Sequence, residues 1–465
     1  MKKITICKAV FLFASLLFAG SLQVNAQSRP KVFGRPVKDV NPENGAIRCV
    51  STEYEEYLQE QNPKRETREQ FEGWITQKIQ EQKASRSANS TNIVVTIPVV
   101  VHVIHNGDAV GQNENIREGQ ILSQIQVLNQ DYRRMIDTPG YNEFANGADV
   151  EIEFCLAQTD PDGNLTNGID RQNLGVSSWT SMDDINSIVK TSTIWDPERY
   201  LNLWTCNYGG DISDVLGYAQ FPSSSGLGGL AVNGGDDNTD GVVIGYRYFG
   251  SADIFPNGNY GGTGNVYRYG RTASHEVGHY LGLIHIWGDN SLCTTNSADS
   301  NKDYCPDTPA ASRANFGCPF SNTCPSSPGS DMVENYMDYT DDTCMSVFTQ
   351  DQKERMRTVL ENSPRRASLV TSTACQAPTG GTNDYKLQGL NVYPNPTQGV
   401  LTINIANGNL PDSYTIYNSI GQTVGSAKIT SASGLTINTS SYSNGIYFIK
   451  VDKGNQTKTL KFIKN

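Results

Sequence analysis

The chain has 465 residues, a formal net charge of −11 and a sequence pI near 5.0. This length is too great for one ordinary domain, so two or three domains are expected. The acidic balance argues against nucleic acid or an anionic membrane surface as a partner.

The N-terminus has the features of an export signal. Two early lysines precede an apolar run from about Ala9 to Ala19, and small residues end the stretch at Ala26. This arrangement predicts a secretory signal peptide over residues 1–26 rather than a membrane anchor, because the apolar run is short. No other stretch approaches spanning length, so the mature protein is expected to have no transmembrane segment.

Strand and helix patterns alternate through the middle of the chain. A polar stretch with a helical pattern at Glu66–Lys83 comes first, and β-branched runs and helical periodicities follow. A helix is expected from about Arg271, and the last helix of this region begins at a capping Thr349. The predicted strands cover Asn92–Ile104, Glu151–Ala157, Tyr200–Asn207 and Gly241–Phe249, and a helix is predicted over 121–134.

Three of the chain's five histidines lie in the run HEVGHYLGLIH, residues 275–285. In a helix, His275 and His279 share one face and can offer two imidazoles to one ion. Glu276 lies where its carboxylate can reach a water on that ion. Gly282 tolerates positive φ, so a sharp turn there can bring back His285 as a third ligand. The pattern predicts a catalytic zinc site, which usually has three protein ligands and a water.

An ordinary core helix, with Leu281, Leu283 and Ile284 turned inward, is the alternative interpretation of this run. It accounts for the leucines but not for Gly282 or His285. The extended motif is also far more specific than HExxH alone. The sequence therefore favours a metal-dependent hydrolase.

Cysteine use is consistent with export. Cys7 belongs to the signal peptide, and Cys49 stands alone in a polar region. The other eight are Cys155, Cys206, Cys293, Cys305, Cys318, Cys324, Cys344 and Cys375. An even number in an exported chain favours disulfides, with Cys155 and Cys206 as one candidate pair on two predicted strands. A second zinc site is the alternative, but oxidising surroundings and the absence of CxxC pairs argue against it.

The composition changes near residue 371. The run TSTACQAPTGGTND lies in a predicted linker over residues 371–386. Beyond it, residues 387–465 hold short β-patterned runs divided by Asn, Gly and Pro turns, which predict a small antiparallel sandwich.

Two motifs carry a family resemblance. The run HEVGHYLGLIHIWGD resembles the metzincin metalloproteases, and ENYMDYTDDTCMSVFTQDQKERM is similar to the Met-turn segment of the pappalysin (cytophagalysin) family within that clan. The resemblance covers about residues 95–362. It implies an α+β fold with an α/β-like N-terminal subdomain: a metzincin catalytic domain over 92–370 with a twisted sheet, an active-site helix and a Met-turn, followed by the all-β sandwich.

The resemblance implies a role for each matching residue of the two motifs. Zinc would be held by His275, His279 and His285. Glu276 would act as general base and then as general acid. Met337 would be the Met-turn residue, packed beneath the zinc without ligating it.

Two further residues have roles implied by the same resemblance. Tyr339 matches a tyrosine that donates a hydrogen bond to the developing oxyanion, and a structural tyrosine is the alternative. Asp342 matches an acidic residue of the S1′ pocket that selects Arg at P1′, for which a carboxylate suits a guanidinium. Asp341 could serve instead, or both could be solvated turn residues.

The resemblance also implies disulfides and calcium. The implied pairs are Cys293–Cys324 and Cys318–Cys344, with Cys375 as one candidate partner for Cys305. Calcium is implied near Asp303, the Pro306 carbonyl and Thr308, whose oxygens suit that ion. A turn without metal is the alternative.

Residues 27–91 fit a prosegment that keeps such an enzyme latent. Cys49, in AIRCVS, resembles the family's cysteine switch, whose thiolate occupies the open zinc position until the segment is removed. A free thiol of little consequence is the alternative. If Arg is preferred at P1′, self-cleavage between Ser85 and Arg86 would release the segment.

The C-terminal module resembles the type IX secretion sorting domain of bacteria, on the runs LNVYPNPTQGVLTI and NGIYFIKV and the basic end KFIKN. This implies the type IX machinery as a partner and transport across the outer membrane, with the domain then removed or used for surface attachment. A carbohydrate-binding or adhesive sandwich is the alternative.

The features combine into one functional prediction. The chain is expected to be a secreted zinc endopeptidase acting on proteins or peptides and made as a latent zymogen. The alternative is a surface adhesion protein whose metzincin domain is an inactive scaffold. Glu276 argues against that alternative, because a scaffold needs no general base.

Overall fold

The computed structural model describes residues 30–85, 93–224, 237–261, 266–293, 303–378, 390–405, 410–454 and 456–465. The predicted signal peptide and Arg86 lie outside these ranges. Within them, no helix combines the length and the apolar character that crossing a membrane requires.

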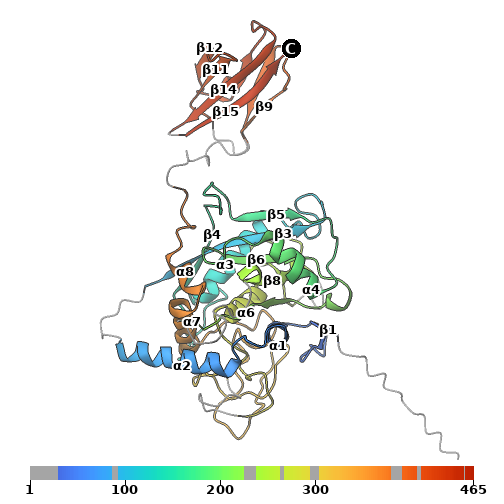
Figure 1. The fold of residues 1–465 in the computed structure, drawn as a ribbon, viewed down its shortest axis with the longest axis vertical. Coiled ribbons are helices and arrows are strands. Elements are labelled where there is room, and N and C mark those ends of the chain that lie inside the picture. Colours follow the sequence, from blue (N-terminus) through green and yellow to red (C-terminus); the bar gives the residue numbers. More distant parts are fainter. Residues whose placement is uncertain are drawn as a thin grey trace, which may run out of the picture.

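A six-stranded mixed sheet forms the centre of the larger unit (Figure 1). Its strands are β3 (Val95–His105), β4 (Ile152–Leu156), β5 (Ile169–Asn173), β6 (Leu201–Cys206), β7 (Gly217–Ala219) and β8 (Val242–Gly245). They follow the order β4-β3-β6-β8-β7, and β5 also pairs with β3. All pairs are parallel except that of β7 with β8, so β7 is an antiparallel edge strand. The predicted strands thus lie in one sheet, although the predicted strand at Gly241–Phe249 ends early, in a 3-10 turn at Tyr246–Tyr248.

Each face of this sheet carries its own core, because side chains alternate along a strand. Val99 and Val101 of β3 pack on the face covered by α3 (Glu118–Tyr132) and α6 (Arg271–Tyr280). On the other face, Trp204 and Tyr218 pack with an irregular helical segment. That segment runs through α4 (Met182–Asp184), the π-helical turn η1 (Ile185–Lys190) and α5 (Thr191–Thr193).

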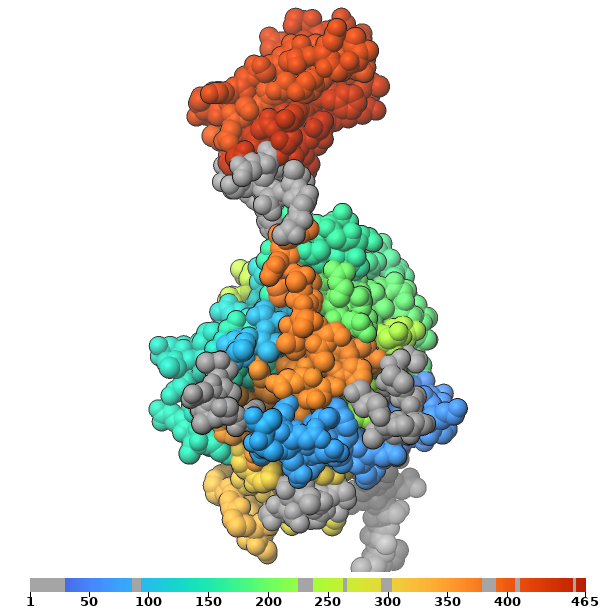
Figure 2. All heavy atoms as spheres, turned by 60° about the vertical axis from the view of Figure 1, so that its left-hand side comes forward, coloured from blue at the N-terminus to red at the C-terminus, as the bar shows by residue number. Residues whose placement is uncertain are grey.

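The N-terminal segment, residues 30–85, packs along β7 and α7. It comprises β1 (Lys31–Val32), β2 (Arg35–Pro36), α1 (Ser51–Gln61) and α2 (Arg68–Ser85). Ile47 forms a parallel bridge with Val215, just before β7. Helix α2 packs on α7 (Gln350–Asn362), and Figure 2 shows its blue atoms against the orange of the later chain. The sequence predicts α2 to within two residues at each end but does not predict α1.

The larger unit ends with α8 (Arg366–Thr371) and a disulfide. The described cysteines form the pairs Cys155–Cys375, Cys293–Cys324 and Cys318–Cys344. The last two are the pairs that the family resemblance implies.

The other two suggested pairings, Cys155 with Cys206 and Cys305 with Cys375, are wrong. Cys155 and Cys206 cannot meet because β4 and β6 flank β3 on opposite sides. After α8 the chain instead returns to β4, where Gln158 N donates to Ala374 O at 2.7 Å, and this brings Cys375 to Cys155. Cys206 and Cys305 are buried free thiols. Because Cys375 lies inside the predicted linker, the larger unit extends beyond its predicted end at residue 370.

The C-terminal residues form the small antiparallel sandwich that the turn-rich sequence predicts. One sheet has the order β13-β10-β9 and the other β12-β11-β14-β15. Leu401, Ile416, Ile449 and Phe462 are buried in its core. The strands are β9 (Asn391–Tyr393), β10 (Val400–Asn404), β11 (Ser413–Asn418), β12 (Thr423–Lys428), β13 (Thr436–Asn438), β14 (Gly445–Lys453) and β15 (Gln456–Lys464).

Candidate metal centre

Helix α6 and the turn after it bring the three histidines together. The helix carries His275 and His279 and ends in a Schellman turn, in which Gly282 N donates to His279 O and Leu283 N donates to Gly278 O, each at 2.9 Å. Gly282 has φ +90°, a conformation that only glycine adopts readily. This turn reverses the chain and places His285 beside the two helical histidines.

Each histidine is oriented through its Nδ1 atom. Nδ1 of His275 lies 2.7 Å from Tyr336 O, and Nδ1 of His279 lies 2.8 Å from Leu283 O. Nδ1 of His285 bonds the carboxylate of Asp289. Because a carbonyl or carboxylate oxygen only accepts, each Nδ1 carries the proton and each Nε2 keeps its lone pair.

The donor set fits a cation. Nε2 of His279 lies 3.1 Å from Nε2 of His275 and 3.1 Å from Nε2 of His285, and all three rings are buried. Three lone pairs pointing at one another repel unless a positive charge lies among them. Three imidazoles with a fourth position left over match the donor set of catalytic zinc.

Cys49 of the N-terminal segment lies beside the three histidines. Its Sγ and one nitrogen from each histidine all lie within 4.8 Å of one another. Burial, followed by the charge of Glu276, raises the pKa of the Cys49 thiol well above its usual range. A cation among the histidines would favour the thiolate instead, since thiolate is a strong zinc ligand.

Glu276 lies beside the histidines with one oxygen engaged by the N-terminal segment. Its Oε2 accepts from Ser51 Oγ at 2.8 Å and from Cys49 Sγ at 3.4 Å. Its Oε1 is buried and has no hydrogen-bond partner among the described residues. Burial raises the pKa of Glu276 to about 8. A buried carboxylate oxygen without a partner is suited to accept a proton from a water held beside it.

Met337 and Tyr339, the other two residues that the resemblance names, lie beside the histidine cluster. A Cβ added to Gly278 would lie only 2.5 Å from Met337 Sδ, so the glycine lets the methionine pack against the active helix. The Tyr339 ring centroid lies 4.8 Å from that of His285, and its hydroxyl donates to Cys49 O at 3.3 Å. Burial raises the pKa of Tyr339 well above its usual range, which keeps the hydroxyl a donor.

Asp342 forms a buried ion pair with the N-terminal segment. Its Oδ1 accepts from Arg48 Nη1 at 2.7 Å, and both side chains have no exposed surface. Its Oδ2 accepts from the backbone N–H groups of Tyr269 and Arg271 at 2.9 and 3.3 Å. The guanidinium lies 4.9 Å from the centre of the Tyr267 ring. Asp342 thus pairs with the arginine that lies one residue before Cys49, whereas Asp341 is partly exposed.

Asp289 is a residue of this centre that the sequence did not reveal. Besides holding His285, its carboxylate accepts from Arg68 Nη2 at 2.7 Å and from Thr52 Oγ1 at 3.2 Å. Although burial desolvates its carboxylate, the Arg68 guanidinium and the hydrogen bond from His285 keep the pKa of Asp289 well below its usual range. A carboxylate that fixes the ring of a ligating histidine is a common partner in zinc sites. Only its position four residues after His285 could have suggested this role.

The proposed calcium residues lie farther along the chain, in a turn of their own. Asp303 accepts from Thr308 Oγ1 at 2.6 Å and from Cys305 N at 3.1 Å. These bonds draw Asp303 and Thr308 together, and they close the turn around Pro306. They also satisfy the carboxylate of Asp303 without requiring a cation.

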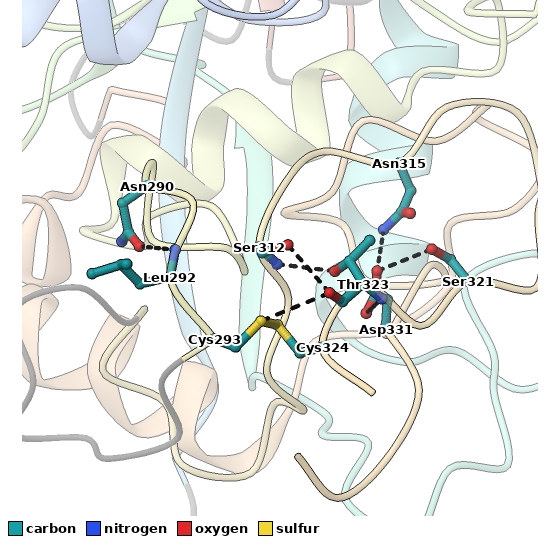
Figure 3. The surroundings of a disulfide bond; sticks show 9 residues. All are labelled: Asn290, Leu292, Cys293, Ser312, Asn315, Ser321, Thr323, Cys324 and Asp331. Atoms are coloured by element: carbon teal, nitrogen blue, oxygen red, sulfur yellow. Dashed lines mark hydrogen bonds between the residues drawn. A yellow bond between two sulfur atoms is a disulfide. The ribbon is translucent and has the colours of Figure 1, made fainter. Parts of the chain in front are cut away.

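The neighbouring loops are tied together by disulfides and by Asp331. Figure 3 shows the Cys293–Cys324 bond and the side chains around it. Asp331 accepts from Thr323 N at 2.9 Å and from Ser321 Oγ at 3.0 Å. These contacts hold in place a region that has few helices or strands.

Two family models match the chain. The model described as pregnancy-associated plasma protein-A matches residues 183–361, and the one described as secretion system C-terminal sorting domain matches residues 391–465.

Several known proteins are similar to the chain. An extracellular metalloprotease of Colletotrichum graminicola is 32% identical over 294 residues, covering 62% of this chain and 86% of the relative. One of Neurospora crassa is 29% identical over 299 residues, covering 63% and 86%. Among solved structures, a point mutant of Tannerella forsythia promirolysin is 37% identical, with a TM-score of 0.50, covering 69% of this chain and 96% of that one.

Proposed function

This chain belongs to the pappalysin family of metalloproteases, and within that family we propose that His275, His279 and His285 hold the catalytic zinc and that Glu276 is the general base. The protein is a secreted or surface-attached metalloendopeptidase made as a zymogen, with a type IX sorting domain at its C-terminus. The observation that carries the proposal is the convergence of three Nε2 lone pairs beside an unpartnered Glu276 Oε1.

The residues of the site divide the reaction between them. A bound zinc ion supplies polarisation of the scissile carbonyl and a water of lowered pKa. Glu276 Oε1 accepts the proton of that water and then passes it to the leaving amine. Tyr339 donates to the oxyanion, and its bond to Cys49 O in the latent form shows that the hydroxyl reaches a backbone carbonyl at this place.

We also propose that Asp342 selects Arg at P1′. The support is Arg48, whose guanidinium fills the pocket at Asp342 while the next residue, Cys49, lies at the histidines. The latent form thus presents the side chain that a substrate would present, on the primed side of the site.

A calcium ion held by Asp303, the Pro306 carbonyl and Thr308 remains a separate proposal.

Latency is proposed to depend on Cys49. In a zymogen with Cys49→Ala, the fourth position at the histidines opens to water, while the Arg48–Asp342 pair remains. A loss of about 1.4 kcal/mol of inhibitory binding raises the active fraction about tenfold. We therefore expect the Cys49→Ala zymogen to be processed spontaneously at least about tenfold faster than the wild-type zymogen, as measured by gel electrophoresis over time. Cys206→Ala removes a buried thiol elsewhere and is the matched control, and equal rates in the two variants would contradict the role of Cys49.

Release of the prosegment is proposed to occur between Ser85, the last residue of α2, and Arg86. The mature protein is then expected to begin at Arg86, as N-terminal mass spectrometry would show. Arg86→Gln is expected to slow processing more than about tenfold, because the S1′ carboxylate loses its cationic partner. A Glu276→Ala zymogen should stay uncut if the cleavage is self-inflicted. Processing of Arg86→Gln at the wild-type rate would exclude this site.

A further inference from the structure

A buried lysine lies among aromatic rings beside the N-terminal segment. Lys190 has no exposed surface, and its Nζ has no hydrogen-bond partner in the part of the chain that the structure describes. The ammonium lies 4.5 Å from the ring centre of Tyr218, 4.9 Å from that of Tyr54 and 5.5 Å from that of Trp204. Cation–π attraction to these rings replaces the missing hydrogen bonds.

One side of this enclosure is formed by the prosegment, which is removed when the enzyme matures. Tyr218 and Trp204 belong to the sheet, but Tyr54 belongs to α1 of the prosegment. Its ring packs edge-on to Tyr218 at 5.1 Å and stacks on Phe33, another prosegment residue, at 4.9 Å. Its hydroxyl donates to Gln220 Oε1 at 3.3 Å. Removal of the prosegment therefore opens a pocket bordered by Lys190, Tyr218 and Gln220.

The position of this pocket follows from the path of the prosegment. Leu216 N donates to Ile47 O at 2.9 Å, and Ala219 N donates to Ser51 Oγ at 2.8 Å, so the segment advances along β7 toward Gln220. The segment passes from Arg48, at the proposed P1′ site, past Cys49 at the histidines and then on toward Gln220. A substrate whose P1′ Arg takes the place of Arg48 therefore has the residues that precede its scissile bond on the Gln220 side. The pocket of Tyr54 thus lies on the non-primed side.

We propose that this pocket, once vacated by Tyr54, is a non-primed subsite that receives an aromatic side chain of the substrate between Tyr218 and Lys190. The assignment of its side of the scissile bond rests on the proposed function of Asp342. Because an α-helix rises 1.5 Å per residue, Tyr54 lies only about 6 Å along α1 from Val50. That distance corresponds to about two extended residues, which places the subsite within P2 to P4.

The chemistry of the walls favours a ring over a carboxylate. An acidic side chain would be desolvated between aromatic faces and would approach the acceptor Gln220 Oε1, whereas a tyrosine hydroxyl donates to that oxygen. The nearby carboxylate of Asp240 forms ion pairs with Arg365 and Arg366, at 2.6 and 2.7 Å. Burial lowers the pKa of Lys190 to about 7 in the latent form, and opening the pocket to water relieves this desolvation and favours the ammonium that attracts a ring.

Peptide cleavage by the mature enzyme tests the subsite. Peptides with Arg fixed at P1′ would carry Tyr, Leu or Asp in turn at P2, P3 and P4. At one of these positions Tyr is expected to exceed Leu in kcat/KM by about 2- to 30-fold, the range of a cation–π contact. Lys190→Met keeps the apolar stem, so it should abolish the preference for Tyr over Leu, and the circular dichroism spectrum of the variant reports its folding.

Lys353→Met on α7, which removes an ammonium paired with Glu151 at 3.1 Å, is the matched control and should keep the preference. Equal cleavage of Tyr and Leu peptides at all three positions, a preference for Asp, or a Tyr preference that survives Lys190→Met would overturn the proposal. Varying the P1′ residue in the same peptide library tests the aromatic subsite separately from the proposed selection of Arg by Asp342. A Lys190-dependent Tyr preference without selection of Arg at P1′ would uphold the aromatic subsite and contradict the proposed role of Asp342.

Discussion

Mature enzyme with Glu276→Ala is expected to keep its metal and lose peptide hydrolysis. The carboxylate is not a member of the donor set, and the three histidines are oriented by Tyr336 O, Leu283 O and Asp289. Loss of a general base lowers kcat by about 10²- to 10⁴-fold. Elemental analysis would measure zinc per chain, and cleavage of an Arg-containing peptide would measure the rate.

Metal removal provides the control for this variant. A chelator is expected to abolish activity of the wild-type enzyme, and added zinc should restore it. The Glu276→Ala variant should stay inactive under both conditions. Hydrolysis by this variant at the wild-type rate would contradict the proposed general base, and wild-type hydrolysis that resists the chelator would contradict the metal site.

Asp342→Asn is expected to remove the preference for Arg at P1′. The amide oxygen can still accept from Tyr269 N and Arg271 N, so the loop is retained, but the charge that faces the guanidinium is gone. An arginine buried without its partner loses about 3–5 kcal/mol, which corresponds to a decrease of about 150- to 5,000-fold in kcat/KM for Arg peptides. Peptides with Leu at P1′ should be cleaved at an unchanged or higher rate.

Asp341→Asn is the matched control, because this neighbouring carboxylate is partly exposed and the buried ion pair of Arg48 is made with Asp342. It should leave the preference for Arg intact. If Asp341→Asn and not Asp342→Asn changed the selection at P1′, the pocket would have been assigned to the wrong residue.

Short-range features of the site could be predicted from the sequence. His275 and His279 are one helical turn apart, and the reversal at Gly282 that returns His285 follows from glycine's access to positive φ. Strand positions such as Val95–His105 also follow from local pattern. In each case the residues that determine the structure lie within about one helical turn or one strand of each other.

Contacts between distant residues could not be predicted in this way. The Cys155–Cys375 bond joins positions 220 residues apart, and its formation depends on the path of the chain after α8. The role of Asp289 depends on its bonds with His285 and with Arg68, and Arg68 lies in a separate segment of the chain. Helix α1 has few apolar residues, and its position depends on the bonds of Ser51 to Glu276 and of Thr52 to Asp289. Contacts between distant residues leave no periodic pattern in the sequence from which they could be predicted.

The Cys155–Cys375 bond determines where mechanical load enters the larger unit. The chain that leads to the sorting domain leaves from Cys375, which is bonded to β4 at one end of the sheet order, while the edge strand β7, along which the N-terminal segment packs, lies at the other end. Tension on an anchored C-terminus therefore passes through a covalent bond into β4 and does not peel α8 from the sheet. An enzyme tethered in this way keeps β7, the edge strand beside the histidines, at the end of the sheet away from the attachment point.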